Sequence, residues 1–107
     1  MNISHLDDLK QRLADQHHPY LEFLREPSMT AGLYRLAAGA TDHQQPHTED
    51  EIYFVVEGRA RVSVDGDQRD VGPGDVIFVR KNVEHRFSEI TEALLLLVLF
   101  APPEAGD

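Results

Sequence analysis

An Asp-Gly pair at residues 65 and 66 separates two segments whose side chains alternate as they do in β-strands. In residues 59–64, apolar side chains at every second position alternate with polar ones, the period expected when one face of a strand is buried. Asp-Gly suits the two positive-φ positions of a tight hairpin turn, and the polar segment 67–71 follows at once. The sequence therefore predicts a β-hairpin and favours an antiparallel sheet around it.

Six further segments have the composition of short strands bounded by turn residues. They are YLEFLR from residue 20, GLYRLAAG from 32, EIYFVVEG from 51, DVIFVR from 75, HRFSEI from 85 and ALLLLVLF from 93. The last is apolar on every face and stops before Pro102-Pro103, which fits a strand buried on both faces better than a helix. Short strands at regular spacing predict an all-β sandwich or barrel.

The N-terminal residues differ in pattern from the rest of the chain. Ile3, Leu6, Leu9 and Leu13 recur at near-helical spacing, and Ser4 is placed to cap a helix over residues 3–16. Pro19 ends whatever begins there. We therefore expect an N-terminal helical segment over residues 1–19, a β-barrel over 20–101 and a flexible tail over 102–107.

The composition excludes several classes of protein. The 107 residues suffice for one compact domain, and 19 acidic against 10 basic residues give a formal net charge of −9. Because this charge repels phosphate, we expect neither nucleic acid nor a membrane as partner. The chain has no cysteine, so disulfides and thiolate chemistry are excluded. The first residues lack the pattern of a signal peptide, and we expect a cytoplasmic protein.

Three residues with metal-binding chemistry can meet in such a barrel. On a straight strand His47 and Glu51 would lie roughly 13 Å apart, too far to share an ion. A turn over residues 48–50 followed by a return strand would bring Glu51 back opposite His47, with Tyr53 on the same face. A helix over this stretch is rejected because the segment that follows is β-forming. His85 would add a third ligand from a different hairpin.

The spacing around His47 resembles a motif of the cupin family. The first cupin motif reads G-x5-H-x-H-x3-E-x6-G, and this chain has Gly39, Gln45, His47, Glu51 and Gly58 in that register. Only the first histidine differs, being Gln45 here. The stretch is long and specific, and the resemblance covers roughly residues 30–100.

The second cupin motif, G-x5-P-x-G-x2-H-x3-N, is present in a weaker form. Gly74 and His85 keep its register, while Arg80, Asn82 and Glu89 replace the Pro, Gly and Asn. Similarity to small single-domain cupins implies a double-stranded β-helix, also called a jelly roll, that is usually dimeric. It also implies a divalent transition metal in the barrel mouth: iron, manganese, nickel, zinc or copper.

The resemblance assigns His47, Glu51 and His85 as metal ligands. Two histidines and one carboxylate are also a known facial set for non-haem iron, with positions left open for water or substrate. Gln45 either binds the metal weakly through its amide oxygen or hydrogen-bonds a metal-bound water. The alternative is a cupin-shaped barrel whose site is unused, in which residues 49–51 are only a solvated acidic turn. Tyr53 and Arg35 are the candidates for a catalytic group beside the metal.

Two functions remain open on the sequence alone. The first is a metal-dependent enzyme of the dioxygenase, isomerase or lyase type acting on a small molecule, with anions among the candidates. The second is a non-catalytic module that binds or senses a small molecule. A homodimer is expected in either case, because the helix and the outer strand faces carry more apolar residues than one small barrel can bury; Leu6, Leu9 and Leu13 are candidates for the interface.

Overall fold

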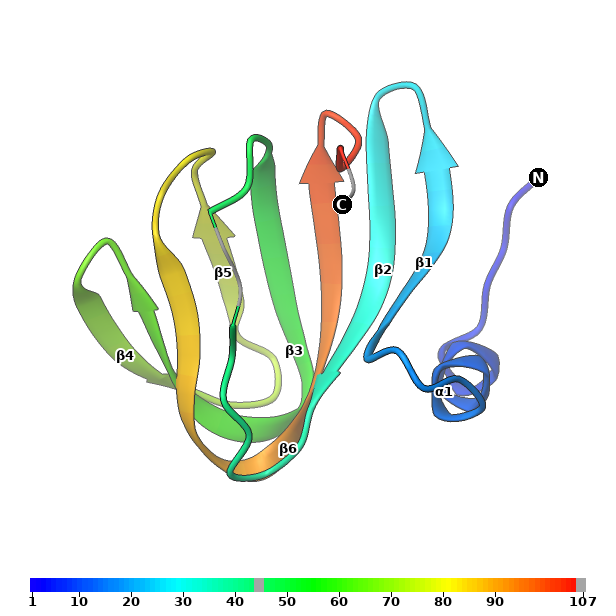
Figure 1. Ribbon diagram of the computed structural model, residues 1–107. Helices are drawn as coiled ribbons and strands as arrows, with labels where there is room; N and C mark the ends of the chain where they lie inside the picture. The colour runs from blue at the N-terminus through cyan, green and yellow to red at the C-terminus, as the bar shows by residue number, and fades with distance from the viewer. Residues whose placement is uncertain (44–45, 106–107) are drawn as a thin grey trace.

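The computed structural model describes residues 1–43 and 46–105, which form one helix and a curled antiparallel sheet (Figure 1). In chain order the elements are α1 (Leu6–Ala14), β1 (Tyr20–Glu26), β2 (Met29–Leu36), β3 (Asp50–Val64), β4 (Asp67–Val71), β5 (Val76–Val79) and β6 (His85–Ala101). The strands pair in the order β1-β2-β6-β3-β4, and β5 pairs with the start of β3. The predicted all-β fold with a short N-terminal helix is confirmed.

Two long strands, β3 and β6, curl the sheet into a barrel. They pair from Asp50–Ala101 at one end to Val64–His85 at the other, with register shifts in the middle. Such irregularities bend a strand and increase its twist. The first part of β3 also pairs with β5, and its last part pairs with β4. The strand therefore runs through two parts of the barrel. As a result β3 begins, and β6 both begins and ends, at the upper end of the barrel in Figure 1.

The turn between β3 and β4 is the predicted hairpin. Asp65 and Gly66 have φ angles of 51° and 85°, and Val64 pairs directly with Asp67. Two successive positive φ angles define a type I′ turn, whose twist matches that of the strands it joins. The prediction made from the Asp-Gly pair is confirmed.

The barrel interior is filled by the inward faces of β3 and β6. In β3, Glu51, Tyr53 and Val55 are buried while Ile52 and Phe54 are exposed, which is the predicted alternation. The inward residues at the end of β6 are Leu94, Leu96, Val98 and Phe100. Leu95 is buried on the opposite face, so this strand is covered on both sides as predicted. Full burial of each such apolar side chain stabilises the fold by roughly 1.5–3 kcal/mol.

Helix α1 is shorter than predicted and begins at Leu6. Its N-cap is His5 and not Ser4, because the Nδ1 atom of His5 accepts a hydrogen bond from the Asp7 amide at 3.1 Å. Ile3 precedes the helix and is 81% exposed. An imidazole nitrogen can thus take the place of the hydroxyl oxygen that the sequence suggested. No helix among the residues described is both long and apolar enough to cross a membrane.

The apolar side of α1 belongs to the chain's own core. Leu9 and Leu13 are buried in a cluster with Leu33 and Leu95 on the outer face of the sheet. The dimer interface expected at these two leucines is therefore wrong, since the sheet of the same chain already covers them.

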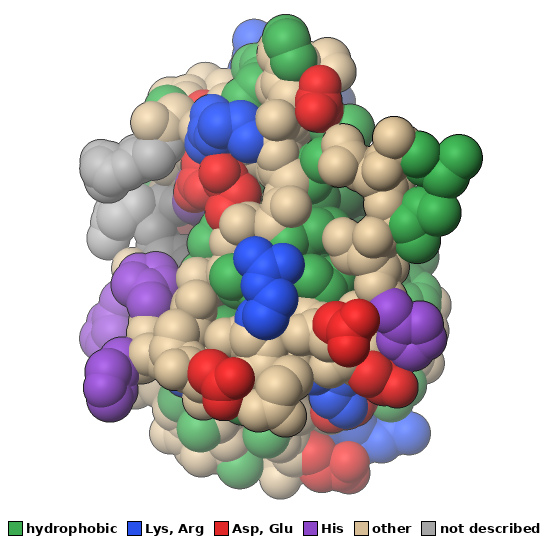
Figure 2. All heavy atoms as spheres, turned by 90° about the vertical axis from the view of Figure 1, so that its right-hand side faces the viewer, with side chains coloured by type: hydrophobic (Ala, Val, Ile, Leu, Met, Phe, Trp, Pro, Cys, Tyr) green, Lys and Arg blue, Asp and Glu red, His purple; other side chains and the backbone are tan. Residues whose placement is uncertain are grey.

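Another part of the outer face remains apolar and exposed. Ile52 and Phe54 in β3 pair with Phe78 and Val76 in β5, and the two β5 residues are 56% and 63% exposed. A hollow of about 380 Å³ between α1 and the sheet continues this surface, and Phe54 lines it. Figure 2 shows apolar side chains at the surface on the α1 side of the molecule. We call the four β3 and β5 residues the outer apolar patch.

Two departures from the second cupin motif have a left-handed backbone. Asn82 stands where the motif has Gly and has φ of 63°, and Glu89 stands where it has Asn and has φ of 46°. Gly and Asn adopt this conformation most readily, and for other residues it costs about 1 kcal/mol or more. The two positions therefore have a backbone conformation that suits the motif's Gly and Asn, and Glu89 adopts it at a conformational cost.

The segment predicted as a flexible tail begins after β6. Its described part, residues 102–105, makes hydrogen bonds to β1, to β2 and to the segment before β3. These bonds place the segment over the same end of the barrel at which β3 begins (Figure 1).

Candidate metal centre

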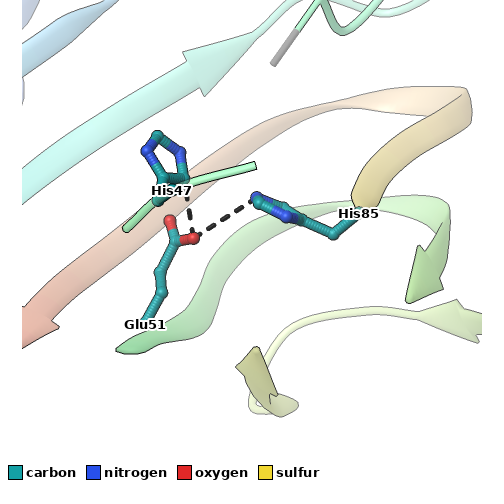
Figure 3. Close-up of side chains that lie close together, drawn as sticks. All are labelled: His47, Glu51 and His85. Carbon is teal, nitrogen blue, oxygen red and sulfur yellow. Dashed lines mark ion pairs between the residues drawn. The ribbon is translucent and has the colours of Figure 1, made fainter. Parts of the chain in front are cut away.

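The structure brings together His47, Glu51 and His85 at this end of the barrel (Figure 3). His47 lies in the segment before β3, Glu51 is the second residue of β3, and His85 is the first residue of β6. One ligand atom from each lies within 4.8 Å of the others. Oε1 of Glu51 is 3.3 Å from Nε2 of His85 and 3.9 Å from Nε2 of His47. The return strand that the sequence required is therefore present.

Two hydrogen bonds from backbone amides hold the loop before His85 against the chain around His47. The Asn82 amide donates to the His47 carbonyl at 2.6 Å, and the Lys81 amide donates to Oδ1 of Asp50 at 2.9 Å. The left-handed conformation of Asn82 turns the chain at this point. The loop before His85 is thus attached to the segment that carries His47, which fixes the distance between the imidazoles.

Glu51 is a buried carboxylate beside the two histidines. The residue is 2% exposed, and among the residues described neither Oε1 nor Oε2 accepts a well-aligned hydrogen bond. An ionised carboxylate is expensive to bury unless a cation or a set of donors compensates it. The two imidazole nitrogens beside Oε1 are the groups that could share such a cation with it.

The contacts of His85 determine which of its nitrogens carries a proton. Nδ1 lies 3.0 Å from the Val83 carbonyl oxygen, which can only accept, so Nδ1 donates. Nε2 then faces Oε1 of Glu51 and, at 3.1 Å, the hydroxyl of Tyr53. A bare lone pair on Nε2 would repel the carboxylate, whereas a proton or a metal ion there makes the contact favourable.

The surroundings of His85 change the pKa of its imidazole in two opposite directions. Burial lowers the pKa of the imidazole, but the Glu51 carboxylate and the Val83 carbonyl raise it by more, so that the net pKa lies above its ordinary value. The pair therefore favours a positive charge at Nε2. A metal ion binding there would release the proton that otherwise occupies the position.

Of the other predicted site residues, Tyr53 reaches the cluster and Arg35 does not. Tyr53 is fully buried, packs edge-to-face on Phe87 and touches His85 through its hydroxyl. The Arg35 guanidinium instead donates to the carbonyl oxygens of Leu13 and Gln16 at 2.6 and 3.1 Å, where it satisfies acceptors at the end of α1. Arg35 therefore points outward to the helix and not to the cluster.

Two more residues that precede His47 in the chain are Gln45 and His43. Gln45, the fourth predicted metal residue, lies outside the described residues. His43 is exposed and is not in the cluster formed by the described residues.

A cavity of about 190 Å³ opens beside the cluster. Its lining residues are His18, Tyr20, Tyr34, His47, Glu51, Tyr53, Val98, Phe100 and Glu104. All three tyrosines of the chain are among them. The volume is below the roughly 300–1,000 Å³ of ordinary ligand pockets, so a ligand here has few atoms.

Tyr20, Tyr34 and Glu104 are among the lining residues that sequence reasoning missed. Tyr20 enters the barrel because Gly32 makes room for it, since a Cβ at Gly32 would lie 2.1 Å from the Tyr20 hydroxyl. Tyr34 is the neighbour of Arg35 in an alternating strand, so once Arg35 points outward Tyr34 must point inward. Glu104 follows a double proline, and no local pattern marked it.

The phenols of Tyr20 and Tyr34 remain protonated at neutral pH. Burial raises the pKa of both, and nearby carboxylates add to the effect, Glu104 on Tyr20 and Asp42 on Tyr34. Both groups are therefore hydrogen-bond donors and not bases, and the Tyr34 hydroxyl donates to Oδ1 of Asp42 at 3.5 Å.

The residues present fit a divalent transition metal. Two imidazole nitrogens and a carboxylate oxygen are donors that such ions accept, and the poorly compensated Glu51 carboxylate supplies the charge to attract one. His47, Glu51 and His85 would hold the ion from one side. The cavity would leave its other side accessible to a ligand.

Comparison with known proteins agrees with the fold. Residues 32–100 match the cupin domain family Cupin_2. The chain is 47% identical over 105 residues to an uncharacterized protein of Streptomyces coelicolor, covering 98% of this chain and 100% of that protein. The crystal structure of TT1209 from Thermus thermophilus is similar, with a TM-score of 0.76, 26% identity and coverage of 96% and 99%.

A further similar structure is that of an enzyme. The DMSP lyase DddQ from Ruegeria pomeroyi has a TM-score of 0.67 and 28% identity, with 71% of this chain matching 39% of that one.

Because the family match covers residues 32–100, the chain belongs to the cupin family. The predicted double-stranded β-helix is confirmed, and a metal ion is a common ligand of the family.

Proposed function

We propose that this cupin is an enzyme that binds one divalent transition metal ion through His47, Glu51 and His85 and acts on a small molecule. The observation that carries the proposal is the poorly compensated, buried Glu51 carboxylate between two imidazoles. A bound ion would supply Lewis acidity toward a carbonyl or hydroxyl oxygen of the ligand. The cavity of about 190 Å³ beside the cluster limits that ligand to a few heavy atoms.

The charge of the lining favours a neutral ligand over an anion. Glu51 and Glu104 are both among the described lining residues, and none of those is Lys or Arg. Two carboxylates balance the charge of one divalent ion, so little positive field remains to attract an anion. We therefore propose a neutral, oxygen-bearing substrate, and the anionic candidate loses its support.

The tyrosines favour proton-transfer chemistry among the candidate reaction types. The hydroxyl of Tyr53 lies 3.1 Å from Nε2 of His85, and Tyr20 and Tyr34 add two further phenols to the cavity wall. Positioned hydroxyls can donate a proton at the reacting atoms, a step that isomerases and lyases use. The similarity to a lyase supports this choice over a dioxygenase.

A non-catalytic binding module is the second candidate. A catalytic site needs an acid or base besides its metal ligands. Among the lining residues described, Glu51 and Glu104 are the only carboxylates, and Glu51 is assigned to the metal. This scarcity of carboxylates is the observation that favours the binding module. In such a module the phenols would hold a small ligand by hydrogen bonds, and the metal would be structural.

Metal content and turnover separate the two candidates. The purified protein should contain a transition metal by elemental mass spectrometry. When it is loaded in turn with Fe²⁺, Mn²⁺, Ni²⁺, Zn²⁺ and Cu²⁺ and given a panel of small neutral hydroxy and keto compounds, we expect product without oxygen uptake. Tyr53→Phe should keep the metal but lower turnover by roughly 10²-fold or more. Saturable binding without product in every metal form would favour the binding module.

We also propose that the chain forms a homodimer through the outer apolar patch. Ile52, Phe54, Val76 and Phe78 are adjacent and exposed, and contiguous apolar surface of this kind marks interaction sites. Light scattering should give a mass about twice the 12.1 kDa of one chain. Val76→Ser combined with Phe78→Ser should shift it to the monomer, whereas Ile3→Ser, at an exposed residue before the helix, should not. A wild-type monomer at micromolar concentration would contradict this.

A further inference from the structure

The segment after β6 folds back over the cluster instead of leaving the barrel. The Glu104 amide donates to the hydroxyl of Thr30 at 3.2 Å, and the Arg25 guanidinium donates to the Glu104 carbonyl at 2.9 Å. The Ala105 amide donates to Oε2 of Glu49 at 3.3 Å. Thr30 and Glu49 are both buried, so the segment is held at two points inside the protein surface.

These contacts bring the Glu104 side chain to His47. Oε2 of Glu104 lies 3.9 Å from Nδ1 of His47, while Nε2 of the same ring lies 3.9 Å from Oε1 of Glu51. The imidazole therefore stands between two carboxylates, one at each nitrogen. The nitrogen that faces the metal cluster is Nε2, and Glu104 lies on the other side of the ring.

The two histidines of the cluster have the same arrangement with different partners. His85 donates from Nδ1 to the Val83 carbonyl and faces Glu51 with Nε2. His47 also faces Glu51 with Nε2, and the Glu104 carboxylate lies beside its Nδ1. Histidines that bind metals donate their second N–H to a carboxylate or a carbonyl, which fixes the tautomer and the ring orientation.

We propose that Glu104 is a positioning residue that holds His47 with Nδ1 protonated and Nε2 directed at the metal. The inference rests on the metal site of the proposed function. The separation of 3.9 Å exceeds a direct hydrogen bond, and a small rotation of the partly exposed side chains or one bridging water closes it. The C-terminal segment is thereby part of the site.

The test compares Glu104→Ala and Glu104→Gln with the wild-type protein by Zn²⁺ titration against a chromophoric chelator. Ala removes the acceptor, so Zn²⁺ affinity should fall by roughly 10- to 100-fold. Gln keeps an acceptor oxygen and should retain most of the affinity. Glu92→Gln is the control, since Glu92 is an exposed carboxylate of β6 that pairs opposite Arg59, far along the strand from the cluster.

The outcomes distinguish this inference from the proposed function. Equal losses in Glu104→Ala and Glu104→Gln would mean that only the negative charge matters, and wild-type affinity in both would mean that Glu104 has no role; either result overturns the inference and leaves the metal site intact. A wild-type protein that binds no Zn²⁺ would overturn both. Melting temperatures of the metal-free variants should match the wild type, which separates positioning from a structural role.

Discussion

His85→Ala should purify with little or no transition metal, and its affinity for added Zn²⁺ should fall by about 100-fold or more. The substitution removes one of three strong ligands and leaves the buried Glu51 carboxylate without its nearest cationic partner. Elemental analysis after gel filtration measures the first effect and chelator competition the second. Addition of metal should raise the melting temperature of the wild type but not of the variant, since binding to the folded state alone adds stability.

His47→Ala should have the same effect, and His43→Ala provides the matched control. His43 belongs to the same segment but is exposed, so its loss should leave metal content unchanged. Full metal retention in both His47→Ala and His85→Ala would rule out the proposed centre. Gln45 is tested in the same series: Gln45→Ala should keep most of the metal, and Gln45→His should tighten binding because imidazole is the better donor. If Gln45→Ala loses as much metal as His47→Ala, Gln45 is a full ligand.

Gly58→Ala should be the most destabilising small substitution in the barrel. Gly58 has φ of 98°, and a Cβ there would lie 2.2 Å from the Ala93 carbonyl oxygen and 2.7 Å from the Cα of Leu94. Both contacts are to backbone, which cannot rotate away. The left-handed conformation costs about 1–2 kcal/mol and the overpacking about 1–3 kcal/mol more. We expect a loss of about 3 kcal/mol or more in the free energy of unfolding, measured by urea denaturation.

Gly39→Ala separates the two contributions. Gly39 also has positive φ, 76°, but no heavy atom lies within 4 Å of the position of its Cβ. Only the conformational cost applies, so the expected loss is about 1–2 kcal/mol. Equal losses in Gly39→Ala and Gly58→Ala would show that the close approach of β3 and β6 at Gly58 has no energetic consequence.

The sequence predicts those parts of the fold that local residue patterns determine. The period of two places Glu51 and Tyr53 on one face, and the Asp65-Gly66 pair predicts its hairpin. The spacing of His47, Glu51 and His85 identifies the cluster because the cupin motif encodes contacts that are distant along the chain. Where only local information was available, as at the start of α1, the helix boundary was misplaced.

The residues that sequence reasoning missed depend on contacts between distant segments. Tyr20 lies in the cavity because Gly32 on the paired strand has no side chain, and Glu104 because Thr30 and Arg25 hold its backbone. Arg35 was a candidate for a catalytic group beside the metal. The docking of α1 against the sheet determines its direction instead, and no pattern within the strand encodes that.

The hydrogen bond from the Asn82 amide to the His47 carbonyl has a kinetic consequence. It joins the loop before β6 to the segment before β3, two parts of the chain that are distant in sequence and meet when the barrel closes. An unfolded chain therefore presents no preformed chelate, and an ion held by the proposed centre would enter after most of the barrel has formed. Once bound, it would act as a removable cross-link between the two longest strands. The bound ion would lengthen the lifetime of the folded protein by slowing its unfolding and not by speeding its folding. Interactions that form after the folding transition state have this effect.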